Sequence, residues 1–228
     1  MLLPITGIGH SLDFLVLIYF YYRIRKSRVV NNKFYYYFER FTLSMSIFFL
    51  LMAIPNLFFP NDSNLLGLGY VVGHVFLYLA YAFLIRVSLF IMKPSFDSKY
   101  IFKLWLLMGA AITALNIYHF NLPVIMGNGV TAYNADASVG FAITAISILT
   151  LLPSAVLFIR ECMVMPQQCR RFALIGASFI LIIIGGPLHD TASTTLLYVI
   201  ADVVTTAGFI VMFIGVIAGN KSAITTKK

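Results

Sequence analysis

Charged residues are scarce in this chain, and that scarcity excludes most classes of soluble protein. Only 11% of the 228 residues are Asp, Glu, Lys or Arg, whereas 61% are hydrophobic and the mean hydropathy is +0.92. Soluble domains carry charges at about a quarter of their positions. The composition therefore predicts an integral membrane protein, and the length leaves no room for a separate soluble catalytic domain.

Recognisable catalytic motifs are also missing. The sequence contains no H-E-x-x-H, no P-loop, no G-x-S-x-G and no Ser/His/Asp set at a familiar spacing. No hydrolase or transferase is therefore indicated. Whether the protein is an enzyme stays open, with a redox role as the enzymatic alternative.

The chain is instead rich in long apolar runs. Seven of them approach the roughly 20 residues that a helix needs to cross the hydrocarbon core of a bilayer. They cover residues 5–22, 41–60, 66–92, 101–119, 137–159, 172–188 and 193–219. The pattern predicts an all-α fold, a single bundle of seven transmembrane helices over residues 1–228, surrounded by the lipid bilayer.

Basic and acidic residues separate between alternate connections. Every Lys and Arg except Arg86 flanks the first, third or fifth connection or the C-terminal end, whereas the other connections carry Asp62, Asp136 and Asp190 without a basic residue. The positive-inside rule then predicts the N-terminus outside and the C-terminus in the cytoplasm, in the plasma membrane. The net charge of +8 thus reflects orientation, and no nucleic acid partner is expected. The outer connection of residues 120–136 is the only one long enough to form a lid.

The two cysteines, Cys162 and Cys169, lie in a basic connection that this orientation places in the cytoplasm. Thiols there are kept reduced, so no disulfide is expected between them. A single C-x6-C pair is also weak evidence for a zinc site.

All four histidines fall in the predicted outer half of the bundle: His10, His74, His119 and His189. Neutral imidazole binds transition metals and serves as an axial ligand of haem b, and a helix bundle can hold either group. This predicts that haem b or a transition metal binds through His74 and one other histidine, for electron transfer or sensing. Asp13, three residues after His10, would orient that ring or ligate the metal. The alternative is that His119 and His189 are hydrated residues at loop edges.

His74 lies deeper in its span than the other histidines. Three glycines near it indicate either close helix packing or room for a flat cofactor: Gly67, Gly69 and Gly73. Tyr70 and Tyr78 share its helical face, at spacings of three and four, together with Tyr81. This stripe is either a helix contact or the wall of a cofactor site.

Two charged residues lie inside predicted spans, Arg86 in the third and Asp202 in the seventh. An ionised side chain in hydrocarbon normally has a partner or faces a cavity. We expect either an intramembrane pair of Arg86 with Asp202, or an arginine that reaches the headgroups and an aspartate that lines a pocket.

The seventh span, TLLYVIADVVTTAGFIVMFI from Thr195 to Ile214, resembles the last helix of microbial opsins. The shared pattern is an apolar run, Asp-Val, three residues and an apolar-Gly-Phe end. The resemblance implies an opsin-like scaffold in which Asp202 corresponds to the aspartate that faces the chromophore. Opsins hold retinal on a lysine four residues further on; that position is Thr206, so covalent retinal is not expected.

The resemblance supports a second hypothesis of a different class. The protein would be a receptor or transducer without retinal, whose pocket around Asp202, Tyr78 and Tyr81 binds a small organic ligand. Its basic inner connections would meet a cytoplasmic or membrane protein partner. A structural subunit of a membrane complex is a third possibility.

Overall fold

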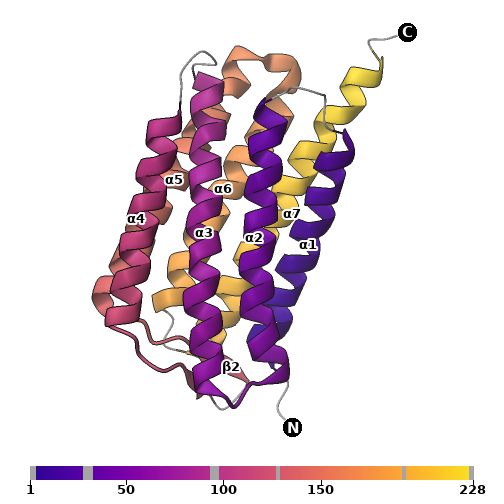
Figure 1. The fold of residues 1–228 in the computed structure, drawn as a ribbon. Coiled ribbons are helices and arrows are strands. Elements are labelled where there is room, and N and C mark those ends of the chain that lie inside the picture. The colour runs from indigo at the N-terminus through magenta and orange to yellow at the C-terminus, as the bar shows by residue number, and fades with distance from the viewer. Residues whose placement is uncertain (1–3, 28–32, 93–97, 127–128, 192–193, 226–228) are drawn as a thin grey trace.

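Seven long helices make up the protein in a computed structural model that describes residues 4–27, 33–92, 98–126, 129–191 and 194–225. Side chains are described in these ranges except at positions 27, 190–191 and 217–225. Six residues used above to predict orientation therefore have no described side chain: Arg28, Lys93, Asp190, Lys221, Lys227 and Lys228. The helices are α1 (Ile5–Ser27), α2 (Lys33–Phe58), α3 (Ser63–Met92), α4 (Lys99–Tyr118), α5 (Ala137–Val164), α6 (Cys169–Thr191) and α7 (Thr195–Thr225), shown in Figure 1. All seven are long and apolar enough to cross a membrane. The predicted multi-pass helical bundle is confirmed.

Several helices extend beyond the apolar runs that predicted them. The helix α2 begins at Lys33 rather than residue 41, and α5 continues to Val164 rather than 159. The added turns contain the aromatic and charged segment KFYYYFER and the segment RECMV. Apolarity marks only the hydrocarbon-spanning part, whereas backbone hydrogen bonding continues the helix into the interfacial layer.

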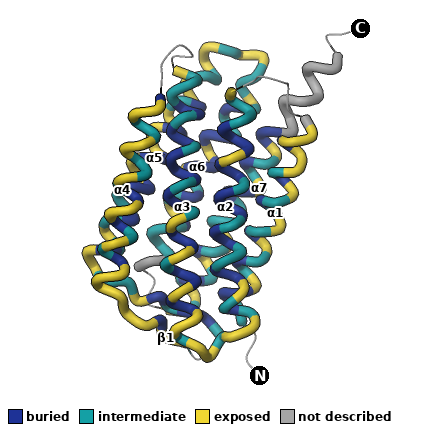
Figure 2. The backbone as a smooth tube through the Cα atoms, viewed as in Figure 1, coloured by how far each residue is buried: buried dark blue, intermediate teal, exposed yellow. Residues whose placement is uncertain are grey.

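Six helices, α1, α2, α3, α5, α6 and α7, form a closed ring, because α3 packs against α5 and α1 packs against α7. The helix α3 contacts α5 as well as α2 and α4, so α4 is excluded from the interior. Only Gly109, Ile112 and Asn116 of α4 are buried, and Figure 2 shows this helix as largely exposed. The interior of the bundle is therefore built by the other six helices.

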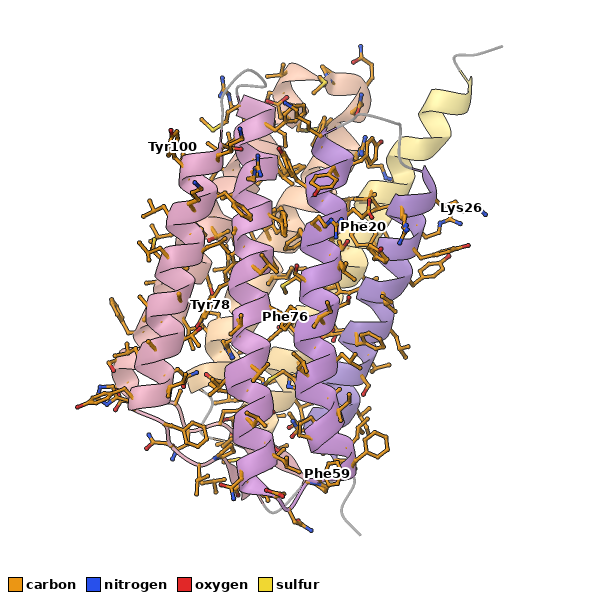
Figure 3. The ribbon with its side chains drawn as sticks, in the orientation of Figure 1. Phe20, Lys26, Phe59, Phe76, Tyr78 and Tyr100 are labelled. Atoms are coloured by element: carbon orange, nitrogen blue, oxygen red, sulfur yellow. A yellow bond between two sulfur atoms is a disulfide. The ribbon has the colours of Figure 1, made fainter. Side chains whose placement is uncertain are left out.

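The two ends of the bundle differ in charge. The described basic residues near the connections lie at the end where α1, α3 and α5 finish, which we call the basic end. Lys26 and Tyr100 mark that end in Figure 3, and Phe59 marks the opposite one. Asp62 and Asp136 lie with Phe59. The charge separation read from the sequence is thus a separation between the two ends of one bundle.

A short antiparallel hairpin covers the end opposite the basic end, which we call the hairpin end (Figure 1). Its strands are β1 (Val124–Met126) and β2 (Val130–Ala132). The backbone N–H of Thr131 donates to Oγ1 of Thr6 at 3.0 Å, and the Thr131 hydroxyl donates to Oδ1 of Asn56 at 2.6 Å. The side-chain amide of Asn56 donates to the Tyr133 hydroxyl. The connection predicted to be long enough for a lid is thus fastened to α1 and α2.

The expectation of two unpaired cysteines is wrong. Cys162, near the end of α5, and Cys169, the first residue of α6, are joined in a disulfide. The short 3₁₀ helix Pro166–Gln168 between them turns the chain back on itself. The expectation rested only on the reducing cytoplasm, and it did not include the turn that brings the two cysteines together.

Acidification below pH 4 is expected to lower the melting temperature of the protein partly through Asp136, the N-cap of α5. Hydrogen bonds from the side chain and backbone of Ser138 hold the pKa of Asp136 below its usual value of 3.8. Because the folded-state pKa is depressed, the stabilisation is present above the unfolded pKa and is lost as the pH falls through the folded one. Melting curves from pH 6 to 3 should therefore decline less steeply for Asp136→Asn than for wild type. Parallel declines would contradict this assignment.

Candidate ligand chamber

A cavity of about 100 Å³ lies inside the hairpin half of the bundle. Every helix except α4 contributes to its lining, and Tyr133, just after β2, closes it on the hairpin side. Most of the lining side chains are apolar or aromatic, including Phe48 and Phe49 from α2 and Phe209 from α7. We call this cavity the chamber.

Three of the four histidines line the chamber. His10 comes from α1, His74 from α3 and His189 from α6, and the ring centroids of His10 and His189 are 5.9 Å apart. His119 does not join them: it caps the C-terminus of α4, is exposed, and packs edge-on against Tyr118. Its exclusion follows from the position of α4 outside the ring.

His10 is buried without a hydrogen-bond partner. Its side chain is 5% exposed, and neither ring nitrogen has a partner in the part of the chain that the structure describes. The expected partner, Asp13, instead accepts a hydrogen bond of 2.7 Å from the Thr206 hydroxyl of α7. Asp13 therefore joins α1 to α7 and does not orient the His10 ring. An imidazole in this state can still accept a hydrogen bond or a metal ion at one nitrogen.

His74 is held by its own helix. Its Nδ1 lies 2.7 Å from the carbonyl oxygen of Tyr70, which accepts the Nδ1 proton and leaves a lone pair on Nε2. The nearby glycines allow close helix packing, which was one of the two interpretations of their spacing; the other was room for a flat cofactor. A Cβ at Gly69 would lie 2.7 Å from the Leu51 carbonyl oxygen, and one at Gly73 would lie 3.3 Å from the Phe48 ring.

The structure does not pair Arg86 with Asp202. Both α3 and α7 begin at the hairpin end; Arg86 is 23 residues into α3 and Asp202 is 7 residues into α7. At 1.5 Å per residue they differ in depth by roughly 24 Å. Asp202 Oδ1 instead lies 3.5 Å from Nε2 of His189, and its side chain lines the chamber.

Arg86 is held near the basic end by neutral neighbours. Its Nε donates to the Ser98 hydroxyl at 3.0 Å, and its guanidinium carbon lies 4.3 Å from the Tyr37 ring centroid and 5.3 Å from that of Phe102. Cation–π contacts of this kind can hold a guanidinium without a carboxylate partner. The predicted ion pair is therefore replaced by an aromatic site.

The tyrosine stripe of α3 divides between two neighbours. Tyr70 and Tyr81 line the chamber, and the Tyr81 hydroxyl is 3.0 Å from that of Ser147. Tyr78, expected in the pocket, instead packs on α4, where a Cβ at Gly109 would lie 2.5 Å from Cβ of Tyr78 (Figure 3). At about 100° per residue, Tyr78 points roughly 60° away from Tyr81 and roughly 80° away from Tyr70, which separates the two contacts.

Tyr133 and Asn56 are site residues that sequence reasoning missed. The Tyr133 ring stacks on Tyr70 with centroids 4.7 Å apart and lies 6.5 Å from that of His189. Burial raises the pKa of the Tyr133 phenol, so the hydroxyl stays protonated at neutral pH. Asn56 could have been found from the sequence, because it is a polar residue inside a predicted span and a buried side-chain amide needs hydrogen-bond partners.

The chamber contains acidic side chains. Asp13 and Asp202 are among its lining residues, and no Lys or Arg is among the described ones. Over the described ranges, no group of three or more His, Cys, Asp or Glu side chains is arranged to hold a metal ion. The preformed features are therefore an aromatic wall, three imidazoles and two carboxylates.

No known family model matches the chain, and no curated protein matches its sequence.

Proposed function

We propose that the protein is a membrane receptor or transducer whose chamber binds a small ligand. One observation carries the proposal: His10 lies in a largely apolar chamber, and neither of its ring nitrogens has a partner among the described residues. Leaving a buried polar group unsatisfied costs about 1–3 kcal/mol. A ligand that hydrogen-bonds to His10 would recover that free energy when it binds.

The composition of the chamber supports a ligand-binding role. Small-molecule sites are mostly apolar and aromatic, with a few polar groups that fix orientation. Here polar side chains come from α1, α3, α5, α6 and α7, while α2 and α3 supply aromatic rings. The volume of about 100 Å³ is below the ~300–1,000 Å³ of drug-sized pockets, which favours a ligand of only a few atoms.

The orientation in the membrane belongs to the same proposal. The positive-inside rule favours a basic end in the cytoplasm of the plasma membrane and a hairpin end outside, and the Cys162–Cys169 disulfide at the basic end is the observation that opposes it. The ligand then arrives from outside past the hairpin, and a cytoplasmic or membrane protein partner meets the basic end. The opsin-like pattern of α7, which places Asp202 against the chamber, agrees with a sensing role.

Thermal unfolding of the detergent-purified protein against a panel of small polar compounds tests the proposal. A ligand at 100 times its Kd stabilises the folded state by about 2.7 kcal/mol. We expect such stabilisation in wild type, its loss in His10→Leu, and its retention in His119→Leu, the matched control outside the chamber. A panel that stabilises wild type and His10→Leu equally, or stabilises neither, would contradict it.

A transition metal is the second candidate, and the proximity of two imidazoles favours it. The ring centroids of His10 and His189 are 5.9 Å apart, a separation that two ligands of one ion can adopt with metal–nitrogen bonds of about 2.0–2.1 Å. A chamber of about 100 Å³ does not fit the macrocycle of haem b, so this candidate is a transition-metal ion.

Elemental analysis and an absorption spectrum separate this candidate from the first. A stoichiometric metal in wild type, lost in His189→Ala and kept in His119→Ala, would establish it. A colourless, metal-free protein that still passes the ligand test above would leave the receptor proposal alone.

A further inference from the structure

The charge of the chamber indicates which class of ligand it takes. Two acidic side chains, Asp13 and Asp202, line it, and the described residues of the lining include no Lys or Arg. A bound cation would stabilise the ionised form of either carboxyl group, whereas an anion would find no cationic partner among these residues.

Asp202 has hydrogen-bonding capacity to spare. Its Oδ1 lies 3.5 Å from Nε2 of His189, beyond the usual range of a hydrogen bond to a carboxylate. The side chain is 14% exposed, and that exposure opens to the chamber. Gly9 lets Asp202 approach α1, since a Cβ at Gly9 would lie 2.9 Å from Oδ2. Asp202 is thereby placed beside the helix that carries His10.

His10 gives a second and independent indication. It is 5% exposed, lines the chamber, and has no partner at either ring nitrogen within the described residues. A neutral imidazole offers one acceptor lone pair, and an ammonium group offers three donors and no acceptor. One ammonium could therefore donate to Asp202 and His10 together.

Aromatic rings supply the rest of the enclosure. Tyr70 and Tyr133 stack on each other at the hairpin side, and Phe49 lies 5.7 Å from the His10 ring, centroid to centroid. Aromatic faces attract organic cations and pack against their alkyl parts. A bare metal ion would gain nothing from such walls, which favours an organic cation.

We propose that the chamber ligand is a small organic ammonium ion, held by the carboxylate of Asp202 and the free nitrogen of His10 against the rings of Tyr70 and Tyr133. This inference rests on the proposed function, since it names the ligand class of the same chamber. The size of the chamber limits the ligand to a short alkyl or similarly compact amine.

The test compares n-propylammonium with 1-propanol, which has the same heavy-atom skeleton and no charge. Binding to the purified full chain at pH 7 is followed by titration calorimetry and thermal unfolding. We expect the ammonium to bind wild type at least tenfold more tightly than the alcohol. Asp202→Asn should abolish that preference, and Asp62→Asn, an exposed aspartate at the same end, should preserve it.

The outcomes separate the ligand class from ligand binding itself. Equal affinities of the two probes for wild type would overturn the ammonium inference and leave the receptor proposal intact; this comparison needs no variant, so it holds even if Asp202→Asn fails to fold. Stabilisation by Zn²⁺ without any ammonium preference would overturn the inference in favour of a metal site. Binding of neither probe would overturn it too, and the broader compound panel then decides the proposed function.

Discussion

Replacing Asn56 with alanine is expected to lower the stability of the protein by about 3 kcal/mol and to release the hairpin. The amide of Asn56 is 2% exposed and makes three hydrogen bonds: it donates to the Met52 carbonyl oxygen at 2.7 Å and to the Tyr133 hydroxyl, and it accepts from the Thr131 hydroxyl. Thr131 and Tyr133 are themselves buried. Each buried polar group left without a partner costs about 1–3 kcal/mol.

Thermal unfolding and hydrogen exchange together measure this effect. The melting temperature of Asn56→Ala should fall by several degrees, and amide protection over residues 130–133 should fall more than protection in the helix interiors. Asn64→Ala, an exposed asparagine two residues after the Asp62 cap, is the matched control. A loss no larger than that of Asn64→Ala would show that the hairpin does not depend on Asn56.

Two adjacent glycines of α6 are expected to respond oppositely to alanine. A Cβ at Gly185 would lie 3.0 Å from the Ala201 carbonyl oxygen and from the Thr205 backbone nitrogen, and would collide with the Thr205 hydroxyl. A Cβ at Gly186, which lines the chamber, would meet no described atom within 4 Å. Overpacking a helix interface costs roughly 1–3 kcal/mol, whereas Gly→Ala in an open helical position stabilises by roughly 0.5–1 kcal/mol.

Unfolding free energies of Gly185→Ala and Gly186→Ala should therefore differ by about 1–3 kcal/mol, the cost of overpacking alone, with Gly186→Ala the more stable. Because both changes alter helix propensity alike, the difference isolates the contact between α6 and α7. The same displacement of Thr205, which lines the chamber, should also weaken ligand binding in Gly185→Ala. Equal stabilities would mean that these helices are not in close contact at Gly185.

Helix number and the charged ends were predictable because the bilayer acts on each segment locally. A span must be apolar over a fixed length and satisfy its own backbone, so residues 66–92 identify their helix without reference to any neighbour. The requirement for apolar residues also misplaced the start of α2, because this helix begins eight residues before the apolar run, in a segment of aromatic and charged residues.

The chamber was predictable only in part, because neighbours in a bundle depend on packing between distant segments. His119 and His189 both lie near the end of an apolar run, yet α6 belongs to the inner ring and α4 does not. Asp202 was expected to face either Arg86 or a pocket. It faces the chamber, because Arg86 lies too far along the bundle axis to reach it. Tyr133 gave no signal in the sequence, since this loop tyrosine is held at the chamber by contacts with distant residues, the hydrogen bond to Asn56 and the stacking on Tyr70.

The central claim is that a ligand binds to His10 in the chamber. A high-resolution density map of the protein saturated with the best-stabilising compound tests it most directly. We predict one continuous feature larger than a water molecule in the chamber, with a donor atom about 3 Å from a ring nitrogen of His10. A chamber holding only separate water molecules at His10, with the compound bound elsewhere, would contradict it.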